Sequence, residues 1–179
     1  MRAVCTDCVR TSGLLYKWQL FKRKIFVENP AGNTPSGVTG VFLTVVSSKL
    51  SPGENYRLYV SVRKNGGKAG NATIDLETNK PPVTGQCSVD PVTGDAMKTQ
   101  FKIKCQGWSD PDLPLTYKFM YKKDGDVTSI SSGPLPSARS VLPVGDPAND
   151  NKLYLLVRVT DSLGLSNQIT LQTKVDLKH

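Results

Sequence analysis

Apolar and polar residues alternate along most of the chain from residue 14 onward. In the stretch that ends at Cys105, Phe101 and Ile103 fall on the same side of an extended backbone as the cysteine, and the lysines fall on the other side. This period of two is typical of strands with one buried and one solvated face. No apolar pattern with a period of 3.6 runs for a helical length. The pattern therefore predicts an all-β protein built from antiparallel sheets.

A double proline divides this pattern into two parts. Pro81 and Pro82 fix φ and lack backbone donors, so neither fits inside a central strand. We therefore expect two units, residues 1–79 and residues 80–179. The second unit looks complete, because an immunoglobulin-like sandwich has about seven strands. Its candidate strands are Gln86–Val89, Lys98–Gln106, Leu115–Lys122, Val127–Ser131, Arg139–Pro143, Lys152–Thr160 and Ser166–Lys174.

The first unit offers about five candidate strands, fewer than such a sandwich needs. These candidates are Leu14–Leu20, Lys24–Val27, Thr39–Val46, Tyr56–Val62 and Ala72–Leu76. We expect two tandem fibronectin-type-III-like (immunoglobulin-like) sandwiches, of which the first lacks its opening strands.

Three residues are expected to anchor these sandwiches. The turn Ser51-Pro52-Gly53 before Tyr56 predicts a tyrosine corner, in which the hydroxyl bonds to upstream backbone at the entry to a core strand. Trp108 follows Cys105 closely and is expected to support the core or its edge; stacking on a carbohydrate is the alternative. Asp110 begins an Asp-Pro-Asp turn.

The four cysteines form two patterns. Cys87 and Cys105 lie on neighbouring strand-like runs, and a hairpin around Pro91–Asp95 would bring them together. A disulfide between them would contribute about 3 kcal/mol in the chain-entropy model. Cys5 and Cys8 form a C-x-x-C, which suits a local disulfide or pairing with residues upstream. A redox site or a zinc site is less well supported, because no helical context follows and further ligands are lacking.

The formal net charge of +8 raises the question of an anionic partner. A solvated strand face is one reading of the lysines, since period-two geometry directs them away from the core. A polyanion-contact site is the other reading. The compact basic run at residues 22–24 lacks interleaved aromatic residues, so nucleic-acid binding is not expected. The lysines concerned are Lys98, Lys102, Lys104, Lys118 and Lys122.

Asn71 begins an N-x-[ST] sequon just past a glycine-rich turn, and it is an expected N-glycosylation site if the chain is secreted. Four aspartates invite a calcium hypothesis, because Ca²⁺ takes about 6–8 oxygen ligands. Asp-Pro-Asp and Asp-Gly-Asp are also ordinary turn sequences, in which the carboxylate binds backbone two residues on, and this reading is preferred. The four are Asp110, Asp112, Asp124 and Asp126.

Catalysis is not expected. The single histidine, His179, is terminal, which argues against a Ser-His-Asp triad. No glycine-rich loop precedes a helix, so a phosphate cradle is unsupported. No cofactor, metal site or catalytic residue is predicted.

The chain resembles the receptor-for-egg-jelly (REJ) module of the polycystin-1 family. The likeness runs in order along almost the whole chain, and its Pro-Pro…Cys…Cys-x-Gly-Trp-x-Asp block is its specific part. The matching elements are Cys5-Thr6-Asp7-Cys8, Tyr16-x-Trp18-x-Leu20, Gly53-x-x-Tyr56-x-Leu58, Asn79-x-Pro81-Pro82, Gly85-x-Cys87, Cys105-x-Gly107-Trp108-x-Asp110, Asp112-x-Pro114-Leu115 and Asp161-Ser162-Leu163-Gly164.

The resemblance implies an extracellular segment of a large membrane receptor or channel subunit, at the plasma membrane or cilium. Such a segment would contact an extracellular protein or glycan, transmit force in calcium-linked sensing, and adjoin the parent protein's membrane-proximal domains. A basic glycan-binding adhesion module and a passive spacer are the alternatives. No signal peptide and no run of about 20 apolar residues is present, so we expect a fragment that does not insert into a membrane itself.

Overall fold

The computed structural model describes residues 13–27, 34–64, 67 and 69–177, without the side chain of residue 26. The chain divides into two compact units, Met1–Asn79 and Lys80–His179. Nearly all the regular structure in the described residues is strand, so the all-β prediction is confirmed. Two short 3-10 helices, Ser47–Lys49 (η2) and Pro147–Asn149 (η3), are the exceptions among them. Within the described residues there is no helix of the length and hydropathy that a membrane span requires.

The first unit contains one antiparallel sheet with the strand order β2-β1-β3-β4. One face of this sheet carries the core, formed by Trp18 and Leu20 of β1 and by Tyr56, Leu58 and Val60 of β3. These residues alternate with exposed or half-buried ones, as the sequence pattern predicts. The strands are β1 (Leu14–Lys22), β2 (Ile25–Phe26), β3 (Asn55–Lys64) and β4 (Ala69–Glu77).

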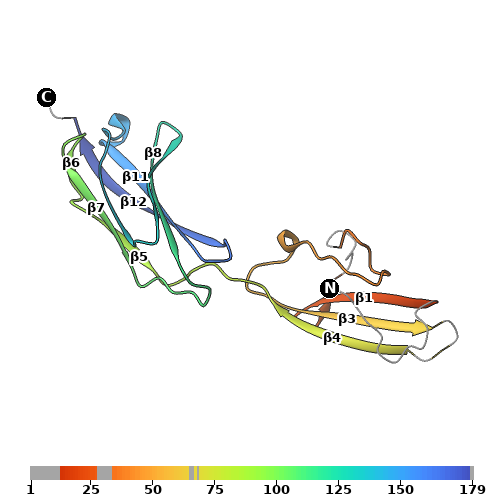
Figure 1. Ribbon diagram of the computed structural model, residues 1–179. Coiled ribbons are helices and arrows are strands. Elements are labelled where there is room, and N and C mark those ends of the chain that lie inside the picture. Colours follow the sequence, from red (N-terminus) through yellow and green to blue (C-terminus); the bar gives the residue numbers. More distant parts are fainter. Residues whose placement is uncertain (1–12, 28–33, 65–66, 68, 178–179) are drawn as a thin grey trace. The chain divides into compact units, whose positions relative to one another are not determined.

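The predicted strand at Thr39–Val46 is wrong. This segment is irregular and has only an isolated bridge at Phe42, and the chain from residue 34 to 50 runs along one side of the sheet (Figure 1). Trp18 makes two hydrogen bonds to the first part of this segment. Its backbone N–H donates to Val38 O at 2.8 Å, and its Nε1 donates to Gly40 O at 2.8 Å. Leu43 is then buried against the sheet. The segment therefore covers the core as a strap rather than joining a ladder.

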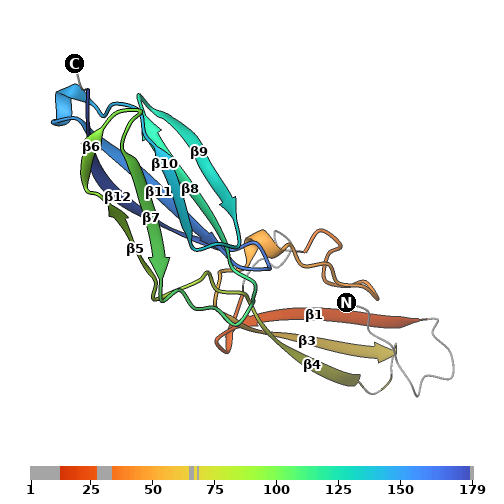
Figure 2. The same ribbon diagram turned by 60° about the vertical axis from the view of Figure 1, so that its left-hand side comes forward.

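The second unit is a two-layer sandwich (Figure 2). One sheet has the order β10-β7-β5 and the other has the order β6-β12-β11-β8-β9. The first sheet contains β5 (Gln86–Asp90), β7 (Gln100–Gln106) and β10 (Ser137–Val141). The second contains β6 (Thr93–Asp95), β8 (Thr116–Lys123), β9 (Asp126–Gly133), β11 (Lys152–Thr160) and β12 (Ser166–Asp176).

The segment Pro91–Asp95 was predicted as a simple hairpin turn, and this prediction is wrong. Thr93–Asp95 forms β6, which leaves the sheet of β5 and pairs in parallel with the end of β12. β12 also holds the residue just before β6, because Lys174 N and Thr173 Oγ1 both donate to Val92 O. The chain thus crosses from one sheet to the other and back between β5 and β7.

The sandwich core lies between the two sheets and is fully apolar at its centre. Phe101, Leu142, Leu155, Val157 and Val159 are all completely buried there. The predicted hairpin at Asp124-Gly125 is present, with φ of 51° and 90° at these two residues between β8 and β9. Glycine accepts such positive φ without a steric penalty, and aspartate tolerates it better than most residues.

Candidate functional site

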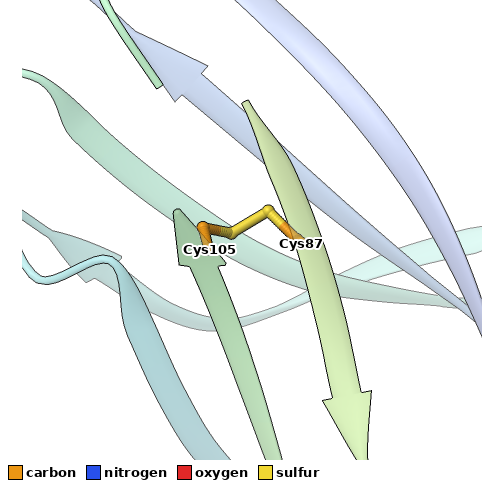
Figure 3. The surroundings of a disulfide bond; sticks show 2 residues. All are labelled: Cys87 and Cys105. Atoms are coloured by element: carbon orange, nitrogen blue, oxygen red, sulfur yellow. A yellow bond between two sulfur atoms is a disulfide. The ribbon is translucent and has the colours of Figure 1, made fainter. Parts of the chain in front are cut away.

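The entry to the second unit is held by a disulfide. Cys87 and Cys105 face each other in the β5–β7 register, and their Cα atoms are 4.0 Å apart. Figure 3 shows the bond joining the two neighbouring strands of one sheet. The predicted disulfide is confirmed, and β5, an edge strand with few apolar residues, is covalently tied to the central strand β7.

Trp108 lies directly on Gly85. A Cβ atom added to Gly85 would come within 2.1 Å of the Trp108 ring, so the indole occupies the place of a side chain. The ring is half-buried and packs against the sandwich core, as expected of an anchor. Next to this contact, the backbones of Val83 and Ser109 form two hydrogen bonds of 3.1 Å, one in each direction. The glycine, the tryptophan and the disulfide thus form one rigid corner where the chain enters the sandwich.

The loop after Trp108 is a network of backbone hydrogen bonds. Asp110 Oδ1 accepts from Asp112 N at 2.7 Å, which is the predicted turn geometry. Ser162 N donates to Asp112 O at 3.0 Å and links this loop to the β11–β12 turn. In that turn the buried Asp161 accepts from Leu163 N and Leu165 N, both at 2.9 Å. These carboxylates accept hydrogen bonds from backbone N–H groups and so stabilise the turns. Among the described residues, no group of three or more His, Cys, Asp or Glu is placed to hold a metal ion.

Pro81 and Pro82 lie at the start of the second unit, directly after the end of the first. On one side, Gly53 N donates to Asn79 O at 2.8 Å within the first unit. On the other, Pro82 is buried and its carbonyl accepts from Asn167 Nδ2 at 3.3 Å within the second unit. The double proline therefore limits backbone freedom at the start of the second unit.

The five lysines singled out in the sequence do not form one site. Lys98 precedes β7, and Lys102 and Lys104 point outward from β7; all three are exposed. Lys118 and Lys122 are exposed on β8, which belongs to the opposite sheet. Because the apolar residues of both strands point into the same core, these two sets of lysines lie on opposite faces of the sandwich.

The β8 face contains a hollow that sequence reasoning missed. Its volume is about 480 Å³, and its basic lining consists of Lys122, Lys123 and Lys152. None of these three lysines makes an ion pair with a described residue, although Asp124 and Asp146 also line the hollow. The neighbouring Lys174 is different, because it donates to Asp150 at 2.6 Å.

Aromatic and apolar surface completes this hollow. Tyr154 lies directly opposite Lys122 in the β11–β8 register, and Leu156 lies opposite Met120. The Lys152-x-Tyr154 spacing on β11 is visible in the sequence. Its alignment with Lys122 depends on the strand pairing, which no local pattern gives. The other face of the sandwich carries Lys102 opposite Arg139.

In the first unit, the predicted tyrosine corner is present. Ser51 N donates to Tyr56 Oη at 2.9 Å, five residues upstream of the buried ring. Asn71 is exposed on β4, so the sequon is accessible in the folded chain. Cys5 and Cys8 lie outside the described residues.

The outer face of this sheet carries an ion pair in a second hollow. Arg57 Nε and Nη2 donate to the two carboxylate oxygens of Asp75 at 2.6 and 2.8 Å. These hydrogen bonds hold the pKa of Asp75 below its usual value, and the arginine charge acts in the same direction. The hollow has a volume of about 750 Å³ and is lined by both residues together with Phe21 and Tyr59.

Comparisons with known proteins agree on a family. A family model described as REJ domain matches residues 1–179. The mouse polycystin family receptor for egg jelly is 27% identical over 96% of this chain and 9% of that protein. Human polycystin-1 is 30% identical over 73% of this chain and 3% of that protein. The chain therefore spans less than a tenth of the length of these relatives.

A solved structure of the chicken CNTN1 FN1–FN3 domains is also similar, with 12% identity and a TM-score of 0.35. That match covers 90% of this chain and 57% of the other.

Proposed function

The chain belongs to the REJ domain family, and we propose that it is an extracellular, non-enzymatic segment of a polycystin-like membrane receptor that bears force and contacts ligand. Its relatives include a receptor for egg jelly and polycystin-1. Partners of this segment would be an extracellular protein or glycan and the parent protein's own membrane-proximal domains, with no nucleic acid and no membrane insertion.

The observation that carries the force-bearing role is the position of the Cys87–Cys105 disulfide. Tension applied at the start of the second unit reaches Cys87 after only two residues of β5. From there the covalent bond passes it directly to Cys105, near the end of β7. The rest of β5, the whole of β6 and most of β7 lie inside the closed loop.

This route removes the load from the β6 side of the contact between β6 and β12. The two strands pair in parallel over three residues, a small contact that a pull along β6 would load directly. With the disulfide intact, the segments on either side of β6 carry no tension. Pulling on the start of the second unit therefore cannot detach β6 from the sheet. The corner of Gly85 and Trp108 stiffens the same entry point.

Single-molecule stretching tests this proposal. The chain is tethered at both ends, and the length released when the second unit unfolds is measured with the disulfide intact and in a Cys87→Ala/Cys105→Ala variant. The cysteines are 18 residues apart in sequence, so the intact chain should release about 60 Å less. The variant should also unfold at lower force. Equal unfolding forces would remove the force-bearing role, and equal released lengths would show that the loop is not closed in the native protein.

A second candidate function, polyanion binding, is favoured by the hollow on the β8 face. Three lysines without ion-pair partners among the described residues gather there beside Tyr154. Unpaired cations around a concave, partly aromatic surface suit a sulfated or carboxylated glycan chain. Such binding should weaken steeply with salt, because the screening length is only about 10 Å at 0.1 M.

Heparin chromatography with matched charge variants tests this function. Replacing Lys122, Lys123 and Lys152 by glutamine should lower the salt concentration at which the protein elutes. A control replaces Lys102, Lys104 and Arg139 by glutamine, which removes the same charge from the opposite face and should change elution little. Equal losses in the two variants would indicate attraction by net charge alone and would contradict a site in the hollow.

A further inference from the structure

Two aromatic side chains lie on the outer face of the first unit's sheet. Phe21 of β1 and Tyr59 of β3 point to this side, since the buried residues of both strands alternate with them. Both are half-buried rather than fully solvated. Together with the flanking polar groups they line the hollow of about 750 Å³. This volume lies within the usual range of about 300–1,000 Å³ for small-ligand sites.

Two of the three cations that line this hollow are paired with carboxylates within the protein. Arg57 is bound by both carboxylate oxygens of Asp75. Arg23 Nε lies 2.6 Å from a carboxylate oxygen of Glu54. What remains is the cation Lys24 and an aromatic floor with hydrogen-bonding groups at its margin, including the hydroxyl of Thr73 and the amide of Asn55. This composition suits a neutral ligand rich in hydroxyl and amide groups better than a polyanion.

The sequon lies on the same face. Asn71, Thr73 and Asp75 alternate along β4, and the register places Thr73 opposite Tyr59. Asn71 is therefore about 7 Å along the strand from Thr73. It is a diagonal neighbour of Tyr59, at the distance of about 7–8 Å that side chains on neighbouring strands span. A sugar chain attached to Asn71 therefore reaches the hollow by extending along this face of the sheet.

We propose that an N-linked glycan on Asn71 lies in this hollow, with its first N-acetylglucosamine residues against the ring of Tyr59. In the attachment step the Asn71 amide nitrogen bonds to C1 of the sugar and loses a proton. The lipid diphosphate of the oligosaccharide donor is the leaving group. The sugar hydroxyl and acetamide groups then meet Thr73 and the Arg57–Asp75 pair. This inference depends on the extracellular location proposed above, and it is independent of the disulfide and of the β8 face.

The full chain secreted from eukaryotic cells tests the proposal. Mass spectrometry should find Asn71 glycosylated. In NMR spectra of the native protein, the N-acetyl methyl protons should be shifted upfield by the aromatic ring and should show contacts with Tyr59. Enzymatic removal of the glycan should be several-fold slower from the native chain than from a Tyr59→Thr variant. Threonine keeps the strand propensity at this position.

A Leu15→Thr variant is the control, because Leu15 lies on the same face but outside the hollow. Its methyl shifts and its rate of glycan removal should match those of the unaltered chain. After denaturation all chains should lose the glycan at the same rate. If Tyr59→Thr fails to fold, the methyl shifts and the ring contacts in the unaltered chain still decide the question. An unmodified Asn71 in secreted protein, or methyl protons with the shifts of a free glycan, would overturn the proposal.

Discussion

At the scale of single residues, the entry corner depends on one glycine. Gly85 needs no special φ, but it must lack a Cβ because the Trp108 ring stands where that atom would be. Sequence spacing cannot reveal this requirement, since the two residues are brought together by the bridge between Val83 and Ser109.

Replacing Gly85 by alanine should therefore destabilise the second unit by about 1–3 kcal/mol, the usual cost of overpacking. Gly133→Ala is a suitable control in the same unit, because no atom lies within 4 Å of the added Cβ. Its effect should stay within about 0.5 kcal/mol. Denaturant unfolding of both variants measures the difference, and equal stabilities would contradict the close contact.

The Arg57–Asp75 pair gives a prediction about pH. Because the hydrogen bonds from Arg57 lower the pKa of Asp75, Arg57→Gln should raise that pKa toward its usual value. The pair stabilises the fold above the pKa of the unfolded carboxyl group, and this contribution is lost as pH falls through the lower folded value. Carboxyl carbon NMR titration measures the shift. Arg63→Gln, at the other end of β3, should leave the titration of Asp75 unchanged.

At the scale of elements, the strap covers only part of the inner face of the first unit's sheet. Leu58 of β3 is 2% exposed, whereas its direct cross-strand neighbour Ile74 of β4 is 44% exposed. Both face the same side of one sheet. The covering segment thus protects β1 and β3 and leaves much of β4 open.

Truncating these two neighbours should give very different results. Leu58→Ala should cost about 2–5 kcal/mol, because it leaves a cavity in a closed core. Ile74→Ala should cost clearly less, since much of its side chain already contacts solvent. Thermal unfolding of the first unit measures both changes. Similar losses would mean that the inner face of β4 is covered in solution.

The tyrosine corner gives a second prediction for the same unit. Tyr56→Phe keeps the buried ring but removes the acceptor for Ser51 N. The loss should be about 0.5–1.5 kcal/mol, typical of one net hydrogen bond. Hydrogen exchange at the Ser51 amide should become faster in the variant, and unchanged exchange would show that this bond does not protect the amide.

At the scale of the whole molecule, each unit has its own core, and the two cores share no residue in the described chain. The Cys87→Ala/Cys105→Ala variant should therefore lower the stability of the second unit by about 3 kcal/mol and leave the first unit's transition in place. Scanning calorimetry of the full chain separates the two transitions. A shift of both by similar amounts would show that the units unfold together.

Much of this fold could be predicted from the sequence, because these features depend on residues that are close together in the chain. Alternation at Phe101 and Ile103 fixed which side chains are buried, since a strand has only two faces. Asp124-Gly125 specified a hairpin because few dipeptides accept its backbone geometry. The double proline was expected to separate two units, and the chain divides at Asn79 and Lys80, just before it. The cysteine pair is confirmed, although the hairpin turn expected to bring it together is absent, because the chain crosses to the other sheet between β5 and β7.

Only the tertiary structure decided the features that depend on which strands become neighbours. A period of two shows which face of a strand is buried, but it does not show which other strand pairs with it. It therefore could not predict that β6 pairs with β12 or that Lys122 meets Tyr154. For the same reason it could not separate the lysines of β7 from those of β8. At Thr39–Val46 the pattern favoured a strand, but the hydrogen bonds from Trp18 held the segment as a strap, because long-range contacts outweigh weak local preference.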